Sequence, residues 1–142
     1  LLDINVWLAL ADENHVHHDR ARDYWQNLSH PEIAFCRVTA FGFLRLSTHP
    51  QVLSRPLTPD EAWGIYRRYR DEEHVVFMED SEEIDTGFMA LSRRPEFLHH
   101  LWTDCYLAAF AQFKGCRIVS FDTDFNRFPG LNFLQLALRV PG

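Results

Sequence analysis

Three aspartates have the residue type and the placement that a divalent metal site requires. Asp3 ends a short apolar run at the start of the chain, and Asp122 follows the apolar run 117–121. Because ligands of open parallel sheets bind at the carboxyl ends of the strands, both acids are expected at one crevice. Asp104 lies in a segment that is apolar nearly all round, typical of a buried helix, so its charge needs compensation. Hard cations prefer carboxylate oxygen, and the three acids together therefore predict a metal site.

A simpler interpretation is that these acids are helix caps. Asp3 and Asp104 both lie near expected helix starts, where a carboxylate is stabilising. Separate caps do not require three acids to meet at one edge of a sheet, however. Taken as a set, the acids favour a site.

The elements that would position these acids alternate along the chain. Strands are expected where short apolar runs occur, at 1–4, 32–36, 75–78, 116–121 and 132–136. Helices are expected between them, at 6–10, 19–28, 39–46, 59–69, 81–91 and 103–114. This alternation predicts an α/β fold with a parallel sheet flanked by helices, and the length suits a single domain over 1–142.

Helix boundaries are marked by cap residues. Thr58 can cap a helix with Pro59 at its first position and Glu61 completing a capping box. Asp80 and Glu83 repeat the same spacing, and Gly115 is a natural stop before the fourth expected strand.

Composition limits the function classes. The net charge of -6 argues against a protein that coats nucleic acid through phosphate attraction alone, but a carboxylate site that holds a metal is compatible with it. No apolar run reaches the roughly 20 residues that span a bilayer. No export signal is visible, and the three cysteines have no metal-binding spacing. These features favour a cytoplasmic protein that does not associate with a membrane.

Four segments resemble the signatures of PIN-domain ribonucleases, most closely those of VapC-type toxins. They are LDINVW at 2–7, TAFGFLRL at 39–46, WTDCYLAAFA at 102–111 and VSFDTDF at 119–125, and FPGL at 128–131 is also similar to that branch. Each motif is weak alone, but together they span nearly the whole chain in the right order.

The resemblance implies a three-layer α/β/α fold with a central parallel sheet of about five strands. It implies an endoribonuclease in which Mg2+ or Mn2+, held by Asp3, Asp104 and Asp122, activates water to hydrolyse RNA. Such toxins typically form homodimers and are inhibited by a VapB-type antitoxin. The positions that match supporting or contact residues are Asn5, Thr103, Ser120 and Asp124 for the site, and Arg45 for RNA or antitoxin.

One position departs from the family pattern. Many relatives carry a glutamate in the helix after the second strand, and alignment on Thr39 and Gly42 puts Ala40 there. Either the site has fewer protein ligands, or Asp124 or Asp12 replaces the missing acid, or activity is lost. The alternative function is therefore a catalytically weakened PIN-like module that binds RNA or protein. A phosphatase or a flap-type DNA nuclease is a less favoured third hypothesis. The sequence does not identify which RNA is cut.

The histidines at 15, 17 and 18 could suggest zinc, but no further histidine or cysteine stands at ligand spacing. They are left out of the predicted site.

Overall fold

The computed structural model describes residues 1–28 and 32–137. Its elements, in chain order, are α1 (Ile4–Ala11), α2 (His18–Gln26), β1 (Ile33–Phe35), α3 (Arg37–Ser47), α4 (Pro59–Asp71), β2 (Val75–Phe77), α5 (Ile84–Ser92), the 3-10 helix η1 (His99–Leu101), α6 (Trp102–Lys114), β3 (Ile118–Ser120), the 3-10 helix η2 (Thr123–Arg127) and β4 (Phe133–Gln135). The six expected α-helices are all present, with boundaries that differ by a few residues.

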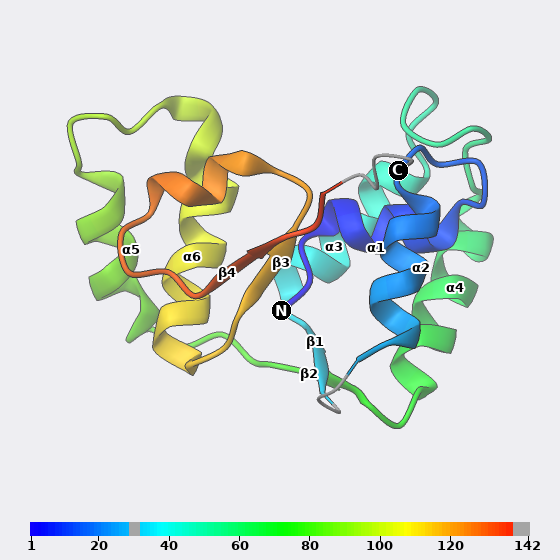
Figure 1. Ribbon diagram of the computed structural model, residues 1–142, viewed down its shortest axis with the longest axis horizontal. Helices are drawn as coiled ribbons and strands as arrows, with labels where there is room; N and C mark the ends of the chain where they lie inside the picture. The colour runs from blue at the N-terminus through cyan, green and yellow to red at the C-terminus, as the bar shows by residue number, and fades with distance from the viewer. Residues whose placement is uncertain (29–31, 138–142) are drawn as a thin grey trace.

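The strands form two parallel pairs joined by the start of the chain. Ile33 pairs with Val75 in β1 and β2, and Ile118 pairs with Phe133 in β3 and β4. Between the pairs, Leu2 N donates to Ala34 O at 3.4 Å, and Leu2 forms a parallel bridge with Val119. The two strand pairs and the Leu2–Val119 bridge are parallel. Together with the Leu2–Ala34 hydrogen bond they give the spatial order β2, β1, residues 1–3, β3, β4 (Figure 1).

The strand expected at 1–4 is wrong as a regular strand. Only Leu2 forms a bridge, and Ile4 already begins α1. The physical reason is Asp3, whose side chain accepts a hydrogen bond from Ile4 N and caps the helix, so that the chain turns directly after Leu2.

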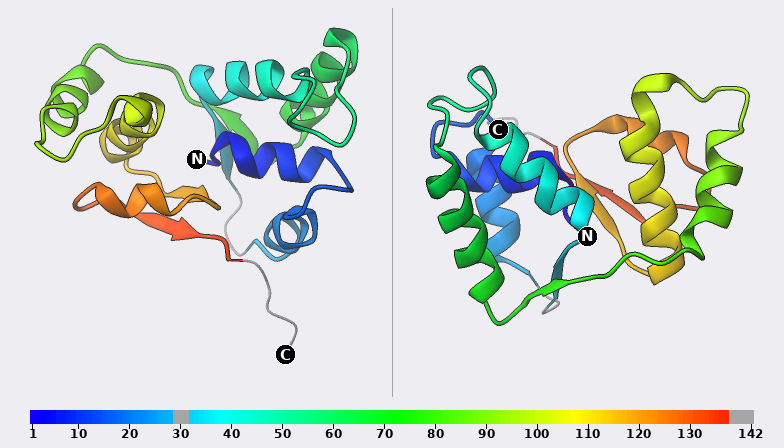
Figure 2. Two further views of the ribbon diagram at one scale, coloured as in Figure 1. Left: turned by 90° about the horizontal axis from the view of Figure 1, so that it is seen from above. Right: turned by 180° about the vertical axis from the view of Figure 1, so that it is seen from behind.

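Helices cover both faces of the sheet. Helices α5 and α6 lie on one side, and α1 to α4 lie on the other (Figures 1 and 2). The strands alternate between two apolar clusters, since Phe35 and Val119 pack with Trp7 while Ala34 and Ile118 pack with the cluster of α6. This period of two is that of a sheet buried on both faces, and it confirms the predicted α/β class.

Two of the three predicted helix boundaries are correct. Thr58 and Glu61 form the capping box, and Gly115 ends α6 with a left-handed φ of 70°. Asp80 and Glu83 do not form the second box: Asp80 accepts hydrogen bonds from Ser81 N and Tyr106 Oη, and no side chain caps α5. Within the described ranges, no helix has both the length and the apolar character needed to cross a membrane.

Candidate metal centre

Asp3 is fixed by its place between the sheet and α1. Its backbone N donates to Val119 O at 2.9 Å, and its Oδ1 accepts from Ile4 N at 2.7 Å. The residue is buried, with 7% of its surface exposed. Asp3 is thus a helix cap, as the simpler interpretation held, but its second carboxylate oxygen is directed to the neighbouring strand.

Ser120, at the end of β3, connects the acids through its hydroxyl. Its Oγ donates to Asp3 Oδ2 at 2.6 Å and accepts from Asp122 N at 2.9 Å and from Asn5 Nδ2 at 3.0 Å. Asn5 Oδ1 in turn accepts from Phe121 N at 3.4 Å. The predicted supporting residues Asn5 and Ser120 therefore lie against Asp3 and the backbone of Asp122, and they fix the turn that follows β3.

Three carboxylates gather at this edge of the sheet. One oxygen each from Asp104, Asp122 and Asp124 lies within 4.8 Å of the other two. The group is assembled by α6 and by the turn after β3, where Asp122 Oδ1 accepts from Asp124 N at 2.9 Å. Asp124, expected only as a supporting residue, belongs to the group. Asp3 lies outside this distance. Its charge nevertheless contributes to the raised pKa of Asp104, and the charge of Asp122 contributes to the raised pKa of Asp3.

Within the group, Asp104 is the acid whose negative charge is not compensated. Burial, followed by the charges of Asp3, Asp122 and Asp124, raises the pKa of Asp104 to about 7. Burial also raises the pKa of Asp3, although hydrogen bonds from Ser120 and Ile4 oppose that shift. Among the described residues no hydrogen bond reaches the Asp104 carboxylate. Hard divalent cations bind such oxygen sets, so the residues fit a metal of the Mg2+ type.

The remaining predicted residues lie around this group or away from it. Asp124 also forms an ion pair with Arg127 at 3.1 Å, and this contact helps to orient its carboxylate. Thr103 is exposed on the first turn of α6, and Arg45 is exposed near the end of α3. Asp12 is not in the group, since its carboxylate accepts from Ser54 N and Ser54 Oγ, both at 2.9 Å. Of the two acids considered as replacements for the one expected at Ala40, Asp124 lies in the group and Asp12 does not.

Ala40 is part of the apolar core beside Trp7 and Phe43, with only 1% of its surface exposed. Two positions further on, a Cβ at Gly42 would collide with the side chain of Ile4. Gly42 therefore lets α3 pack closely on the first residue of α1, directly after Asp3.

A contact that the sequence did not suggest supports the turn carrying Asp122. The ring of His17 stacks on Phe121, with centroids 4.1 Å apart and planes 9° apart. His17 Nδ1 is buried without a hydrogen-bond partner among the described residues. The only signal in the sequence is the run of histidines, whose spacing does not match a zinc site and does not indicate a ring stack.

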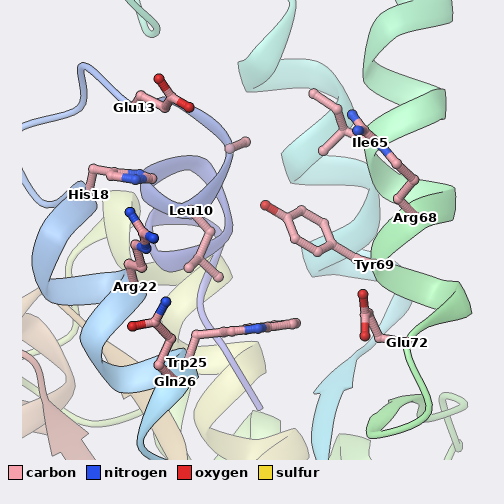
Figure 3. A pocket seen from close by; sticks show the side chains of 11 residues that line it. Leu10, Glu13, His18, Arg22, Trp25, Gln26, Ile65, Arg68, Tyr69 and Glu72 are labelled. Atoms are coloured by element: carbon pink, nitrogen blue, oxygen red, sulfur yellow. The ribbon is translucent and has the colours of Figure 1, made fainter.

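A separate hollow of about 520 Å³ lies between α2 and α4, lined also by the end of α1 (Figure 3). None of the clustered acids lines it. Its apolar wall includes Leu10, Trp25, Ile65 and Tyr69, and charged side chains complete the lining: Glu13, Arg22, Arg68 and Glu72.

Comparison with known proteins identifies the family to which this chain belongs. The family model of the PIN domain matches residues 1–131, so the chain belongs to the PIN domain family. Its relatives are VapC ribonucleases: Ribonuclease VapC41 of Mycobacterium tuberculosis H37Rv is 36% identical over 143 residues, covering 96% of this chain and 98% of that protein. Ribonuclease VapC38 of the same strain is 31% identical, covering 86% of this chain and 84% of that protein. The predicted resemblance is confirmed.

The fold has a solved counterpart. The crystal structure of Mycobacterium tuberculosis VapC20, described as a sarcin-ricin loop cleaving toxin, matches with a TM-score of 0.71 at 17% identity. The match covers 92% of this chain and 94% of that one. At that identity the match shows a shared fold alone.

Proposed function

We propose that this chain is a metal-dependent endoribonuclease that hydrolyses RNA phosphodiester bonds as the toxin of a VapBC-type pair. The observation that carries the proposal is the group of Asp104, Asp122 and Asp124, whose ligand oxygens lie within 4.8 Å of one another. The similarity to VapC ribonucleases over nearly the full length of both chains supports the same reaction.

The residues of the proposed site have different roles. Asp104, Asp122 and Asp124 would hold Mg2+ or Mn2+ directly, and Asp3 lies beside them as a further acidic oxygen. When bound, such an ion supplies Lewis acidity to the phosphate and lowers the pKa of water toward neutrality. Ser120 and Asn5 orient Asp3 and the turn that carries Asp122. Thr103 is proposed to support the site, and Arg45 is proposed to contact RNA or the antitoxin.

Cleavage of a labelled RNA by the purified chain, with and without Mg2+ or Mn2+, tests the proposal. Asp104→Asn removes one charge from the group and should reduce the metal-dependent rate at least about a hundredfold. Asp85→Asn is the matched control, because Asp85 is exposed on α5 and lies outside the group. Equal cleavage by all three proteins would show that the activity does not use this site.

Ala40 favours a second candidate, a PIN-like module that binds RNA or protein without cutting. Ala40 is a small apolar residue buried in the core, at the position where the resemblance to VapC-type toxins implies an acid, so this position offers no carboxylate to a metal. Calorimetric titration with Mn2+ separates the two functions. Absence of binding by the folded protein would support the binding module, whereas a site abolished in Asp104→Asn would support the enzyme.

We further propose two protein partners, a VapB-type antitoxin and a second copy of the chain. The hollow between α2 and α4 suits one face of an amphipathic helix, since Trp25 and Tyr69 offer apolar contact while Arg22 and Arg68 offer charge.

Large apolar side chains that stay exposed on α5 and α6 are compatible with a homodimer: Met89, Trp102 and Phe113. Co-expression with a VapB-type antitoxin and sedimentation of the purified complex test both, and Arg68→Glu should weaken antitoxin binding.

A further inference from the structure

Two arginines converge on one aromatic ring at the outer strand of the sheet. The Cζ of Arg37 lies 4.7 Å from the centroid of the Phe77 ring, and the Cζ of Arg70 lies 4.9 Å from it. Arg37 begins α3, Arg70 lies in the last turn of α4 and Phe77 ends β2, so three separate elements bring these side chains together. Two like charges are therefore held close to each other on a partly buried ring.

Neither guanidinium has a carboxylate partner within the part of the chain that the structure describes, where every ion pair involves other arginines. Arg70 Nη1 donates to Tyr66 Oη at 3.1 Å, but Arg70 Nε is buried without an acceptor. A buried donor without a partner costs free energy, as does the repulsion between two cations. An anion with several acceptor oxygens, bound between the exposed parts of the two guanidinium groups, would offset the repulsion between them, and phosphate is one of the anions whose oxygens match the guanidinium fork.

The Phe77 ring that both arginines contact lies at the end of β2, on the same sheet edge as the acids. Phe77 pairs with Phe35, and Leu2 N donates to the neighbouring Ala34 O, so Phe77 is two strands away from the segment that ends at Asp3. With strands about 4.8 Å apart, that separation is about 10 Å across the sheet. Because all strands run parallel, the ends of β1, β2 and β3 face the same edge (Figure 1).

We propose that Arg37 and Arg70, held on Phe77, bind a backbone phosphate of single-stranded RNA on the same strand as the phosphate that is cut, at a distance of a few nucleotides. This inference rests on the proposed function and names a substrate contact beyond the metal centre. Phe41 and Arg45 extend the surface, since they follow Arg37 at successive turns of α3 and both are exposed, Phe41 by 63%. Alternating cations and an exposed ring suit an unpaired RNA strand, whose phosphates bind arginine and whose bases stack on aromatics.

The test is RNA binding by a chain that does not cut. In an Asp104→Asn background, anisotropy of a short labelled single-stranded RNA is measured over a range of salt concentrations. Arg37→Gln and Arg70→Gln should each weaken binding about tenfold at low salt. Each should also reduce the slope of log affinity against log salt by about 0.7, the value for one phosphate contact on a single strand.

Arg67→Gln is the matched control, because Arg67 is an exposed arginine of α4 that does not contact the Phe77 ring. Arg37 is exposed at the start of α3, so Arg37→Gln is expected to fold even if Arg70→Gln does not. A salt slope in Arg37→Gln equal to that of the control would overturn the proposal. Unchanged RNA binding together with lost antitoxin binding would also overturn it and would assign the arginines to the protein partner. If the unsubstituted chain cuts RNA with metal while Arg37→Gln binds RNA normally, only this inference fails and the proposed function stands.

Discussion

Replacing Ser120 by alanine should damage the fold and the metal centre together. The Ser120 hydroxyl is fully buried and has three partners: Asp3 Oδ2, which accepts from it, and Asp122 N and Asn5 Nδ2, which donate to it. Without it, the buried Asp3 carboxylate loses a hydrogen bond, and the N–H of Asp122 loses its acceptor. A lost bond to a charged group costs about 1.5–3 kcal/mol, and an orphaned buried donor costs about 1–3 kcal/mol. Allowing for relaxation and water entry, we expect Ser120→Ala to lower the free energy of unfolding by about 2–4 kcal/mol.

Urea denaturation measures this loss, and Mn2+ calorimetry measures the effect on the site. Ser47→Ala is a matched control, because the Ser47 side chain is also fully buried but its hydroxyl makes one hydrogen bond among the described residues, to Leu44 O at 3.3 Å, on the part of α3 beyond Gly42. The control should lose about 1 kcal/mol and bind Mn2+ normally. Ser120→Ala should bind Mn2+ about 10–100-fold more weakly, as when a residue that orients a ligand is removed. If the two variants have equal stability and equal Mn2+ affinity, our account of Ser120 is wrong.

Three further predictions follow from the geometry. Because the pKa of Asp104 is raised to about 7, the folded metal-free protein keeps a proton that the unfolded chain releases near the ordinary aspartate pKa of 3.8. The free energy of unfolding should therefore fall as pH rises between these two values, and the affinity for metal should rise through about pH 7. Thermal melts measure the stability profile, which Asp104→Asn should flatten. Gly42→Ala should displace Ile4 and cost about 1–3 kcal/mol in urea denaturation, and a neutral effect would contradict the close approach of the two helices. His17→Ala should weaken Mn2+ binding in calorimetry, because loss of the ring stack loosens the turn after Phe121. His17→Phe can keep the stack and should bind Mn2+ as the unsubstituted chain does. An equal loss of Mn2+ affinity in both variants would exclude the stack as the cause.

Two of the three clustered acids could be assigned to the site from local patterns in the sequence. Asp122 follows an apolar run and Asp104 interrupts an apolar helix, and these local patterns are enough to bring them to one edge of a parallel sheet. Asp124 was underestimated, because its place in the group depends on the turn in which its N–H donates to Asp122 Oδ1. The regular strand expected at the start of the chain failed because capping by Asp3 begins α1 one residue later.

Contacts between distant segments left no local pattern in the sequence. His17 and Phe121 are far apart in the chain, and nothing in either neighbourhood predicts that the rings stack. The convergence of Arg37 and Arg70 on Phe77 depends in the same way on how α3 and α4 pack against β2. Such contacts are set by packing between elements, which periodicity and capping signals do not encode.

The most direct test of the account is the metal dependence of RNA cleavage in Asp124→Asn. This variant keeps Asp104 and Asp122 and removes one charge from the group. The cleavage rate of a labelled RNA is measured against Mn2+ concentration for the unsubstituted chain and for Asp124→Asn at the same pH and salt. If the three aspartates hold the ion that cleavage needs, half-maximal rate should require at least about tenfold more Mn2+ in the variant, because ligand charge sets the affinity for hard cations. The same half-maximal concentration and the same maximal rate in both proteins would contradict the metal centre proposed for this chain.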